Sequence, residues 1–494
     1  MNDIKQYFSD FFEVDEKIIE SYGAINISLI NDLPLFIDPF LLFNSEKVEY
    51  QQIHKEIINY LLFLQKQTEM YPMFDTGIFK SWYWFPEIKQ TWIGFSLEGN
   101  SGRGLGRNFA LGLHKGLQDI YKNFGRETIT RSSHLEKLCL ISPLVGRDKI
   151  SDFTTNFAKK YLLEYTTIFA STYLSTEQCK KFIVTKVDFN YKTMSWVDKE
   201  YYLPCFKDDF VLLTPRDMVT RDNTFINRPD MIRNLDNIAP SIEDAAVRFE
   251  LNNYFTEVLT RKNKEMPKKE KDKVAEALII KYPLLIDYYI KVKEEKEADA
   301  TSISEKVVSE AKKFFNENTQ KLTLKLNSNT DFYNLNGDSY EEAYNRVSYL
   351  KNVIEDMDGY RLFYIDGKPI KRESDLQIMY RLLWYASDYD VNREVNNGRG
   401  PVDFKISHGS KDAALVEFKL ASNSKLKNNL AKQVEVYQKA NNCDKAIKVI
   451  LYFTTEEYEK VIKILNELKL QNCEDIVLIN AIGNKASASN VVMD

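Results

Sequence analysis

The sequence predicts an α/β protein of several domains, with a mixed sheet flanked by helices towards its C-terminal end. The chain has 494 residues, which exceeds the usual size of one domain, and 44% of them are hydrophobic, enough for packed cores. From about residue 374 onward, helical patterns alternate with short strand-like runs, as in an α/β layer. We divide the chain into an N-terminal domain (1–240), a charged helical connector (241–345) and a C-terminal domain (346–494).

Charge and cysteine content narrow the class of protein. The formal net charge of −5 excludes a generally basic surface, so any contact with nucleic acid must come from a local patch. Five widely spaced cysteines and four histidines show no zinc-ligand spacing, and an odd cysteine count fits a reducing compartment. The first residues lack the pattern of a signal peptide, and no apolar run is long enough to span a bilayer. We therefore expect a cytoplasmic protein without a membrane partner.

The N-terminal domain is predicted to be mixed α/β or mainly helical. Ile25–Leu29 and Leu33–Ile37 have the composition of two strands joined by a turn. Helical periodicity covers Glu56–Gln67 and Ile150–Leu174.

Two further segments before the C-terminal domain have unusual composition. The glycine-rich segment Gly94–Gly116 predicts a flexible loop that leads into a helix from about Asn108, with phosphate binding as the alternative interpretation. In the connector, Arg261–Lys273 is a solvated basic stretch, and Val274–Tyr289 carries a helical apolar stripe. Contact of the basic stretch with nucleic acid is a secondary interpretation.

The C-terminal domain has the clearest pattern. Ser374 and Gln377 form the S-x-x-Q pattern of a capping box, which predicts the start of a helix. Three strands, a helix, a strand, a helix and a last strand are then expected at Val391–Val395, Val402–Ile406, Ala414–Leu420, Lys427–Ala440, Ala446–Phe453, Glu456–Leu468 and Ile476–Ile479. The order α-β-β-β-α-β-α-β predicts a layer of helices on a mixed central sheet.

Alternation along two neighbouring strands places charged side chains on one face. The apolar residues of Ala414–Leu420 point into the core, so Glu417 and Lys419 point the other way. In the preceding strand the same alternation leaves Asp403 and Lys405 on the polar face. Two facing carboxylates repel unless a cation binds between them, and hard oxygen ligands suit Mg²⁺ or Mn²⁺. Lys419 can then orient a water molecule for attack on a phosphodiester and stabilise the developing charge.

The order of these residues resembles a known nuclease signature. The run GRGPVDFKIS is followed by ALVEFKLAS and then by a helix with the pattern QxxxY. This series is similar to the PD-(D/E)XK nuclease superfamily, in its QxxxY-containing branch, and covers roughly the last quarter of the chain. The resemblance implies a restriction-endonuclease-like domain in which Asp403, Glu417 and the backbone carbonyl of Phe418 are metal ligands.

The same resemblance implies roles for residues further along the chain. Lys419 and Gln433 would be catalytic, with Gln433 near the scissile phosphate, and Tyr437 would have a supporting role. The family often places another acid on its first helix. Glu373 has that position in the sequence, although the capping pattern just after it would leave it outside the helix. Glu394 is the alternative acid, and an ion pair within its strand is an equally good interpretation of that residue.

The predicted function follows from this resemblance and from a local group of basic residues. The candidates for phosphate contact are Arg399, Lys405, Lys425, Lys427 and Lys432. We predict a Mg²⁺-dependent endonuclease that cuts DNA, with residues 1–345 as a sensor, specificity or oligomerisation module. An RNA-cutting effector and a non-catalytic nucleic-acid-binding or assembly protein are the alternatives.

The architecture also suggests a biological setting and a state of assembly. A large N-terminal part joined to such a nuclease resembles bacterial antiphage defence effectors, so other defence proteins are the expected partners. A homo-oligomer is expected as well, because cutting both strands of a duplex conveniently uses two active sites.

Overall fold

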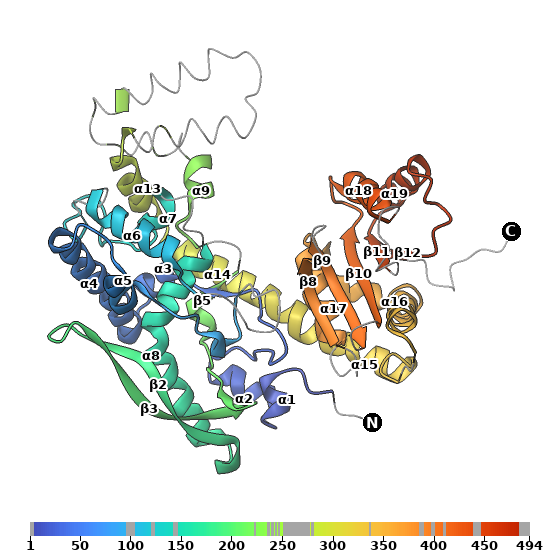
Figure 1. The fold of residues 1–494 in the computed structure, drawn as a ribbon, viewed down its shortest axis with the longest axis horizontal. Helices are drawn as coiled ribbons and strands as arrows, with labels where there is room; N and C mark the ends of the chain where they lie inside the picture. Colours follow the sequence, from blue (N-terminus) through green and yellow to red (C-terminus); the bar gives the residue numbers. More distant parts are fainter. Residues whose placement is uncertain are drawn as a thin grey trace.

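The computed structural model consists of two bodies joined by a long helical connector (Figure 1). It describes residues 4–94, 104–119, 124–141, 147–221, 224–234, 281–334, 337–384, 390–396, 401–408, 412–437 and 446–483, with isolated positions between 238 and 277. The predicted mixed α/β class is confirmed. Within these ranges, no helix combines the length and the apolar character that crossing a bilayer requires.

The N-terminal body consists of helices, short strands and one long antiparallel ribbon (Figure 1). Its two longest helices, α4 (Val48–Met70) and α8 (Arg147–Tyr173), include the two helices predicted there. The ribbon pairs β2 (Cys179–Asn190) with β3 (Ser195–Phe206) and is absent from the sequence-based prediction. The remaining elements are α1 (Phe8–Phe11), α2 (Glu16–Ser21), β1 (Phe36–Ile37), α3 (Pro39–Asn44), α5 (Thr76–Ile78), η1 (Phe79–Tyr83), η2 (Lys89–Thr91), α6 (Arg107–Asp119), α7 (Lys137–Ile141), η3 (Thr176–Gln178), β4 (Asp209–Phe210), η4 (Arg216–Met218), β5 (Val219–Thr220) and α9 (Arg228–Arg233).

The prediction of two paired strands at Ile25–Leu29 and Leu33–Ile37 is wrong. Only β1 forms there, and it pairs with β5 from much later in the chain. The rest of this buried segment makes hydrogen bonds to several distant segments, since the amides of Ile25, Leu29 and Leu33 donate to the carbonyls of Thr214, Gln6 and Trp92. The apolar composition therefore reflects burial at the centre of the body and not a local hairpin.

The glycine-rich segment is described only at its C-terminal side. Residues 95–103 lie outside the described part of the chain, and the expected helix is present as α6. Gly104 has a φ of +59°, and a Cβ atom there would lie 2.7 Å from the backbone nitrogen of Glu87. The close approach and the left-handed backbone both require glycine at this turn.

The connector carries the chain from one body to the other. After α13 (Leu284–Glu294), the segments α14 (Glu297–Lys312), η6 (Lys313–Asn318) and α15 (Thr319–Asn329) follow one another without a break, with η6 in π-helical form. The basic stretch predicted at Arg261–Lys273 lies outside the described residues.

The C-terminal body is a five-stranded mixed sheet with helices on it, in the strand order β12-β11-β10-β9-β8. Strands β8 (Asp390–Asn396), β9 (Pro401–His408) and β10 (Asp412–Leu420) are antiparallel neighbours. Strands β11 (Ala446–Tyr452) and β12 (Ile476–Asn480) continue the sheet in parallel with β10. The other elements are α16 (Ser339–Asp356), η7 (Gly359–Phe363), β6 (Tyr364–Ile365), β7 (Lys368–Pro369), α17 (Glu373–Trp384), α18 (Leu426–Tyr437) and α19 (Thr455–Glu467). The predicted order α-β-β-β-α-β-α-β is confirmed from α17 to β12.

Helix packing fixes which face of this sheet is the core. Tyr380 of α17 packs against Phe404 of β9 and Phe418 of β10, with ring centroids 5.0 and 4.2 Å apart. Leu426 and Leu430 of α18 belong to a separate apolar cluster with α19. The sheet is therefore covered by two groups of helices.

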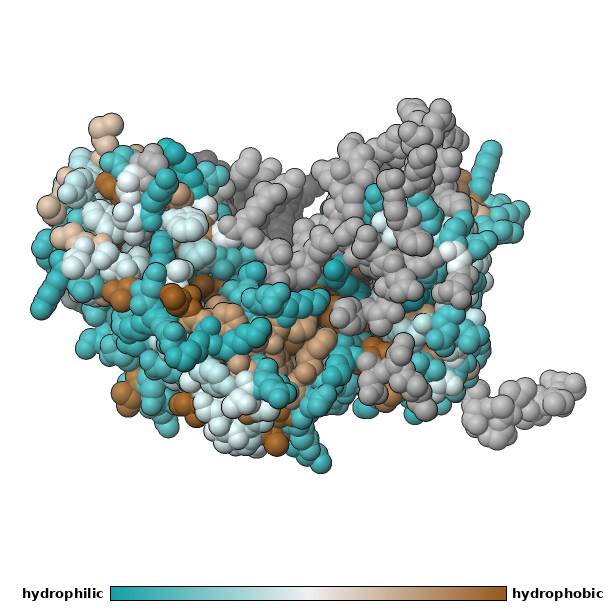
Figure 2. Space-filling model, turned by 60° about the horizontal axis from the view of Figure 1, so that its bottom comes forward, coloured by the Kyte–Doolittle hydropathy of each residue, from teal (hydrophilic) through white to brown (hydrophobic). Residues whose placement is uncertain are grey.

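The outer surface is mostly polar. Figure 2 shows hydrophilic residues over most of the face drawn, with hydrophobic residues in small groups among them. Exposed large apolar side chains come from well-separated elements, such as Val48 of α4, Ile183 of β2 and Leu324 of α15. Single exposed apolar residues of this kind are ordinary for a folded protein.

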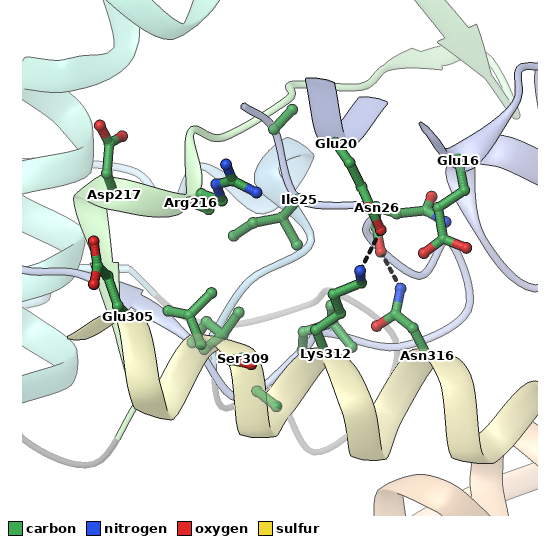
Figure 3. Close-up of a pocket in the computed structure, with 15 residues that line it drawn as sticks. Glu16, Glu20, Ile25, Asn26, Arg216, Asp217, Glu305, Ser309, Lys312 and Asn316 are labelled. Carbon is green, nitrogen blue, oxygen red and sulfur yellow. Dashed lines mark hydrogen bonds and ion pairs between the residues drawn. The ribbon is translucent and has the colours of Figure 1, made fainter. Parts of the chain in front are cut away.

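A cavity lies where the N-terminal body meets the connector. Its volume is about 400 Å³, and α2, the segment 24–35, η4, α14 and η6 line it. In the close-up, Lys312 forms an ion pair with Glu20, and the side-chain amide of Asn316 donates to the backbone carbonyl of Asn26 at 2.7 Å (Figure 3). These contacts join the connector to the N-terminal body along one wall of the cavity.

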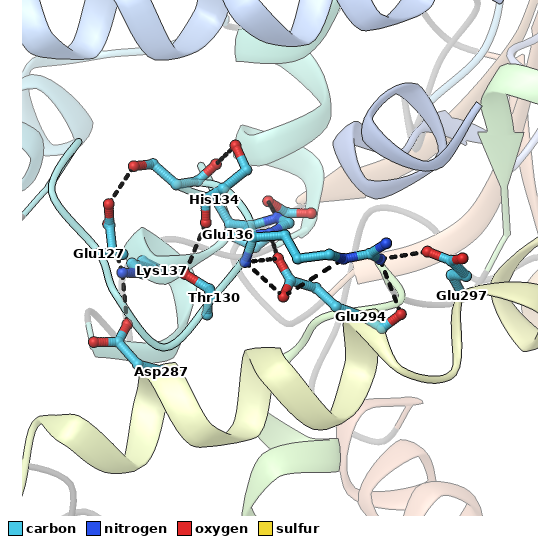
Figure 4. Close-up of polar contacts among 11 residues, drawn as sticks. Glu127, Thr130, His134, Glu136, Lys137, Asp287, Glu294 and Glu297 are labelled. Atoms are coloured by element: carbon cyan, nitrogen blue, oxygen red, sulfur yellow. Dashed lines mark hydrogen bonds and ion pairs between the residues drawn. The ribbon is translucent and has the colours of Figure 1, made fainter. Parts of the chain in front are cut away.

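A buried polar network joins the segment 124–141 to α13 (Figure 4). The carboxylate of Glu294 accepts hydrogen bonds from the amide of Arg131 at 2.9 and 3.0 Å and lies 2.9 Å from Nε2 of His134. Lys137 lies 2.6 Å from carboxylate oxygens of both Glu127 and Asp287. Burial lowers the pKa of His134, because the imidazolium would lose its hydration.

The stability of the N-terminal body should depend on pH through His54. This residue of α4 is buried beside Phe43 and His134, and burial lowers its pKa to about 3. An unfolded histidine titrates near 6.5, so the unfolded state binds more protons below that pH, and the free energy of unfolding falls as the pH drops from about 6.5 towards 3. At pH 5 the loss from His54 alone is about 2 kcal/mol.

Chemical denaturation at pH 7 and pH 5 measures this loss. His54→Leu should lose about 2 kcal/mol less than the wild type between the two pH values. Equal losses in both proteins would show that His54 is not the titrating group.

Candidate active site

The candidate site lies where the end of β10 meets the first turn of α17. Strand β10 alternates as predicted, since Val416, Phe418 and Leu420 are at most 2% exposed. Glu417 and Lys419 point to the other face, with side chains 14% and 12% exposed. The apolar residues anchor the strand, and this alternation fixes the direction of the two charged side chains.

Glu373 is the first residue of α17, so the prediction that Ser374 caps this helix is wrong. Ser374 is exposed in the first turn, and the amide of Asp375 donates to the carbonyl of Arg372 at 3.2 Å. Acidic residues are favourable in a first turn because the free backbone amides there carry partial positive charge. The acid expected on the first helix therefore lies within the helix and not before it.

Two carboxylates and one ammonium group meet at this junction. Lys419 Nζ lies 3.0 Å from Oε1 of Glu417 and 3.6 Å from Oε2 of Glu373. The other oxygen of Glu373 accepts hydrogen bonds from the side-chain amide of Asn423 at 2.7 Å and from the amide of Leu420 at 3.2 Å. One cation thus compensates two acids that would otherwise repel each other.

Asp403 lies on β9, the strand that pairs with β10. The described ladder ends with Val416 opposite Phe404, so Asp403 is the next residue along β9 and Glu417 the next along β10. On the other side of β9, the ladder with β8 sets Glu394 opposite Asp403. The side chains of Asp403 and Glu394 themselves lie outside the described part of the structure.

Three more residues were selected by the resemblance to the nucleases, and the structure describes the side chain of one of them, Phe418. Gln433 and Tyr437 lie on α18, but the structure does not describe their side chains. Phe418 buries its ring against Tyr380, so its side chain belongs to the core.

Of the five basic residues predicted to contact phosphate, the structure describes the side chains of Lys405, Lys425 and Lys427. Arg399 and the side chain of Lys432 lie outside the described residues. Lys405 is half-buried on β9, and Lys425 is exposed just before α18. Lys427 is exposed and forms an ion pair with Glu467 at 2.6 Å.

Lys448 is a buried residue beside the site that the sequence analysis does not select. It lies on β11 in register with Glu417. Burial lowers its pKa to about 8, and the nearby Lys419 contributes in the same direction while Glu417 opposes it. Its signal in the sequence is a single lysine inside the apolar run AIKVILYF, where a strand with both faces buried is expected to be wholly apolar.

The donor chemistry of this site is that of carboxylate oxygens. Among the described side chains, no group of three or more His, Cys, Asp and Glu residues is arranged to hold a metal ion. Glu373 and Glu417 are the acids whose side chains the structure describes here. Hard oxygen donors of this kind fit Mg²⁺ or Mn²⁺ and do not fit a soft metal ion that prefers thiolate ligands.

Two family models match parts of the chain. Residues 13–227 match a domain of unknown function (DUF8370), and residues 339–455 match a second domain of unknown function (DUF8371). The second match runs from α16 to the start of α19 and includes Glu373, Asp403, Glu417 and Lys419. Comparison with curated proteins gave no match. Comparison with solved structures gave none either.

The contacts of Glu373 predict the effect of a nearby substitution. Asn423→Ala removes the shorter of the two hydrogen bonds to this carboxylate, so the free energy of unfolding should fall by about 1–2 kcal/mol. Urea denaturation measures the change, and Ser424→Ala, at the exposed neighbouring position, is the control. A stability equal to that of the control would contradict the hydrogen bond.

Proposed function

We propose that this protein is a metal-dependent nuclease of the PD-(D/E)XK type that hydrolyses phosphodiester bonds of DNA. The observation that carries the proposal is the convergence of Glu373, Glu417 and Lys419 within ion-pair distance. Asp403, on the neighbouring strand β9, would lie on the same face of the sheet as Glu417, as strand alternation predicts. The arrangement is supported by the order of Asp403, Glu417 and Lys419 in the sequence, which is that of the nuclease signature.

Asp403, Glu417 and the carbonyl of Phe418 would hold Mg²⁺ or Mn²⁺. When bound, the ion would supply Lewis-acid activation of the phosphate and of the attacking water. Lys419 contributes a cation that two carboxylates hold in place, so it can donate to a water molecule or to the developing phosphate charge without first reorganising. Glu373, fixed by Leu420 and Asn423, restrains Lys419 from the helix side. Gln433 would act next to the scissile phosphate.

The nucleic acid would bind through a local basic patch, because the whole chain carries a formal net charge of −5. Lys405, Lys425 and Lys427 are its described members, and Arg399 and Lys432 complete the proposal. We place the protein in the cytoplasm, as a homo-oligomeric effector of bacterial antiphage defence that works with other defence proteins. This setting is supported by the fusion of a large N-terminal part to the proposed nuclease.

Substitutions at the site should abolish cleavage without unfolding the protein. Glu417→Gln and Lys419→Met should each lower the Mg²⁺-dependent rate at least about 100-fold. Glu417→Gln weakens a proposed ligand of the metal ion, and Lys419→Met removes the cation that would stabilise the developing charge on the phosphate. The rate is measured on plasmid DNA, single-stranded DNA and RNA with Mg²⁺ and with Mn²⁺, and circular dichroism checks the fold.

Glu459→Gln is the matched control, because Glu459 is an exposed acid on α19 and makes the same change of charge. Equal cleavage by the wild type and Glu417→Gln would refute the assigned site. If the protein cuts RNA but not DNA, RNA is the substrate in place of DNA.

The basic patch predicts how binding depends on salt. Lys425→Glu should weaken DNA binding and reduce the slope of log affinity against log salt by about 1, as expected when one phosphate contact is lost. Fluorescence anisotropy between low and physiological salt, without Mg²⁺, measures both quantities. Lys17→Glu on α2 changes the net charge equally at an exposed position of the N-terminal body and should leave the slope unchanged. If the slope is the same in Lys425→Glu and Lys17→Glu, the DNA does not bind at Lys425.

A further inference from the structure

Helix α17, which carries Glu373, is held from outside by the N-terminal body. In its first turn, Asp375 Oδ1 lies 2.5 Å from a terminal guanidinium nitrogen of Arg221, the residue that follows β5. In its last turn, the carbonyl of Leu382 accepts a hydrogen bond of 2.7 Å from the side-chain amide of Gln6. Both ends of the helix are therefore bound to residues far away in the sequence.

The Arg221–Asp375 contact is a buried ion pair between the two bodies. The two side chains are only 5% and 7% exposed. The guanidinium also lies over the ring of Phe315 in η6, 5.1 Å from its centroid, and the hydroxyl of Tyr7 donates to the carbonyl of Phe315. A charge in such a place is retained only with its partner, so the contact fixes the position of the helix relative to the N-terminal body.

The path from this ion pair to the candidate site is short. Asp375 and Glu373 lie two residues apart in the same helical turn, so neither can shift without the other. Glu373 in turn bonds to Leu420 and Asn423 and stands 3.6 Å from Lys419. The position of the first turn of α17 therefore sets the distance between Glu373 and the ammonium group.

We propose that Arg221 is a positioning residue of the nuclease site, through which the N-terminal body controls cleavage. Arg221 holds Asp375, Asp375 fixes the first turn of α17, and this turn keeps Glu373 bonded to the end of β10. Movement of the N-terminal body away from α17 lowers cleavage. The inference rests on the proposed nuclease function, and it gives residues 13–227 a regulatory role towards that site.

The test uses the full chain with Arg221→Met, Asp375→Asn and the double variant. Hydrogen–deuterium exchange reports on the Leu420 amide, which donates to Glu373, and needs no catalytic activity. We expect exchange in the segment 420–423 to be about tenfold faster in Arg221→Met, and Glu373→Gln to show the same increase. The cleavage rate should fall about 10- to 100-fold at unchanged KM for DNA, as for other residues that orient a site indirectly.

Two further variants separate positioning from general instability. Lys47→Met removes an exposed ion pair with Asp217 within the N-terminal body and should leave exchange and cleavage unchanged. Arg221→Lys keeps the charge and should recover part of both signals. If Arg221→Met does not fold, Asp375→Asn and Arg221→Lys carry the comparison with the wild type.

The outcomes distinguish this inference from the function on which it rests. Wild-type exchange at 420–423 and wild-type cleavage in folded Arg221→Met would overturn the role of Arg221 and leave the nuclease intact. A wild-type protein that cuts no nucleic acid, with faster exchange in Arg221→Met, would overturn the nuclease and leave the mechanical link between the bodies. If the wild type cuts no nucleic acid and exchange at 420–423 is unchanged in Arg221→Met, both the nuclease function and the role of Arg221 are overturned.

Discussion

The ammonium group of Lys419 between the carboxylates of Glu373 and Glu417 is the interaction on which the candidate site depends. The two acids come from different elements, a helix and a strand, and in a partly buried space they would repel each other more strongly than in water. Their common counterion removes this repulsion and also joins the start of α17 to the end of β10. The charge balance that a nuclease would use is thus part of what holds the C-terminal body together.

The C-terminal body follows closely from the sequence because its determinants are local. Strand alternation has a period of two, so Val416, Phe418 and Leu420 in the core are enough to direct Glu417 and Lys419 to the opposite face. Only a few residues separate β9 from β10, and so short a connection makes the two strands antiparallel neighbours. The position of Glu373 was harder to predict, because a capping pattern one residue later suggested a different helix start.

Less of the N-terminal body could be predicted from the sequence, because the contacts that determine its fold join residues far apart in the chain. The segment 25–37 is as apolar as a strand, yet its amides bond to carbonyls that lie far away in the sequence. The β2–β3 ribbon carries many polar residues, and its register shifts between Val184 and Asp188, which breaks the alternation that would reveal it. The burial of Lys448 could not be predicted from its own strand for the same reason. Glu417, the acid in register with it, lies on the neighbouring strand β10.

The π-helical segment η6 makes the length of the connector a constraint in its own right. Because α14, η6 and α15 are continuous, each residue of the rod sets the rotation of everything beyond it, by about 100° in the α-helical parts and by less in the wider turn of η6. Phe315 lies within η6, under Arg221, so the wider turn there is placed where the two bodies touch. Loss or gain of one residue in η6 would swing the sheet around the axis of the rod and separate the arginine from α17. The rod should therefore tolerate the exchange of an exposed side chain more readily than the insertion or deletion of one residue.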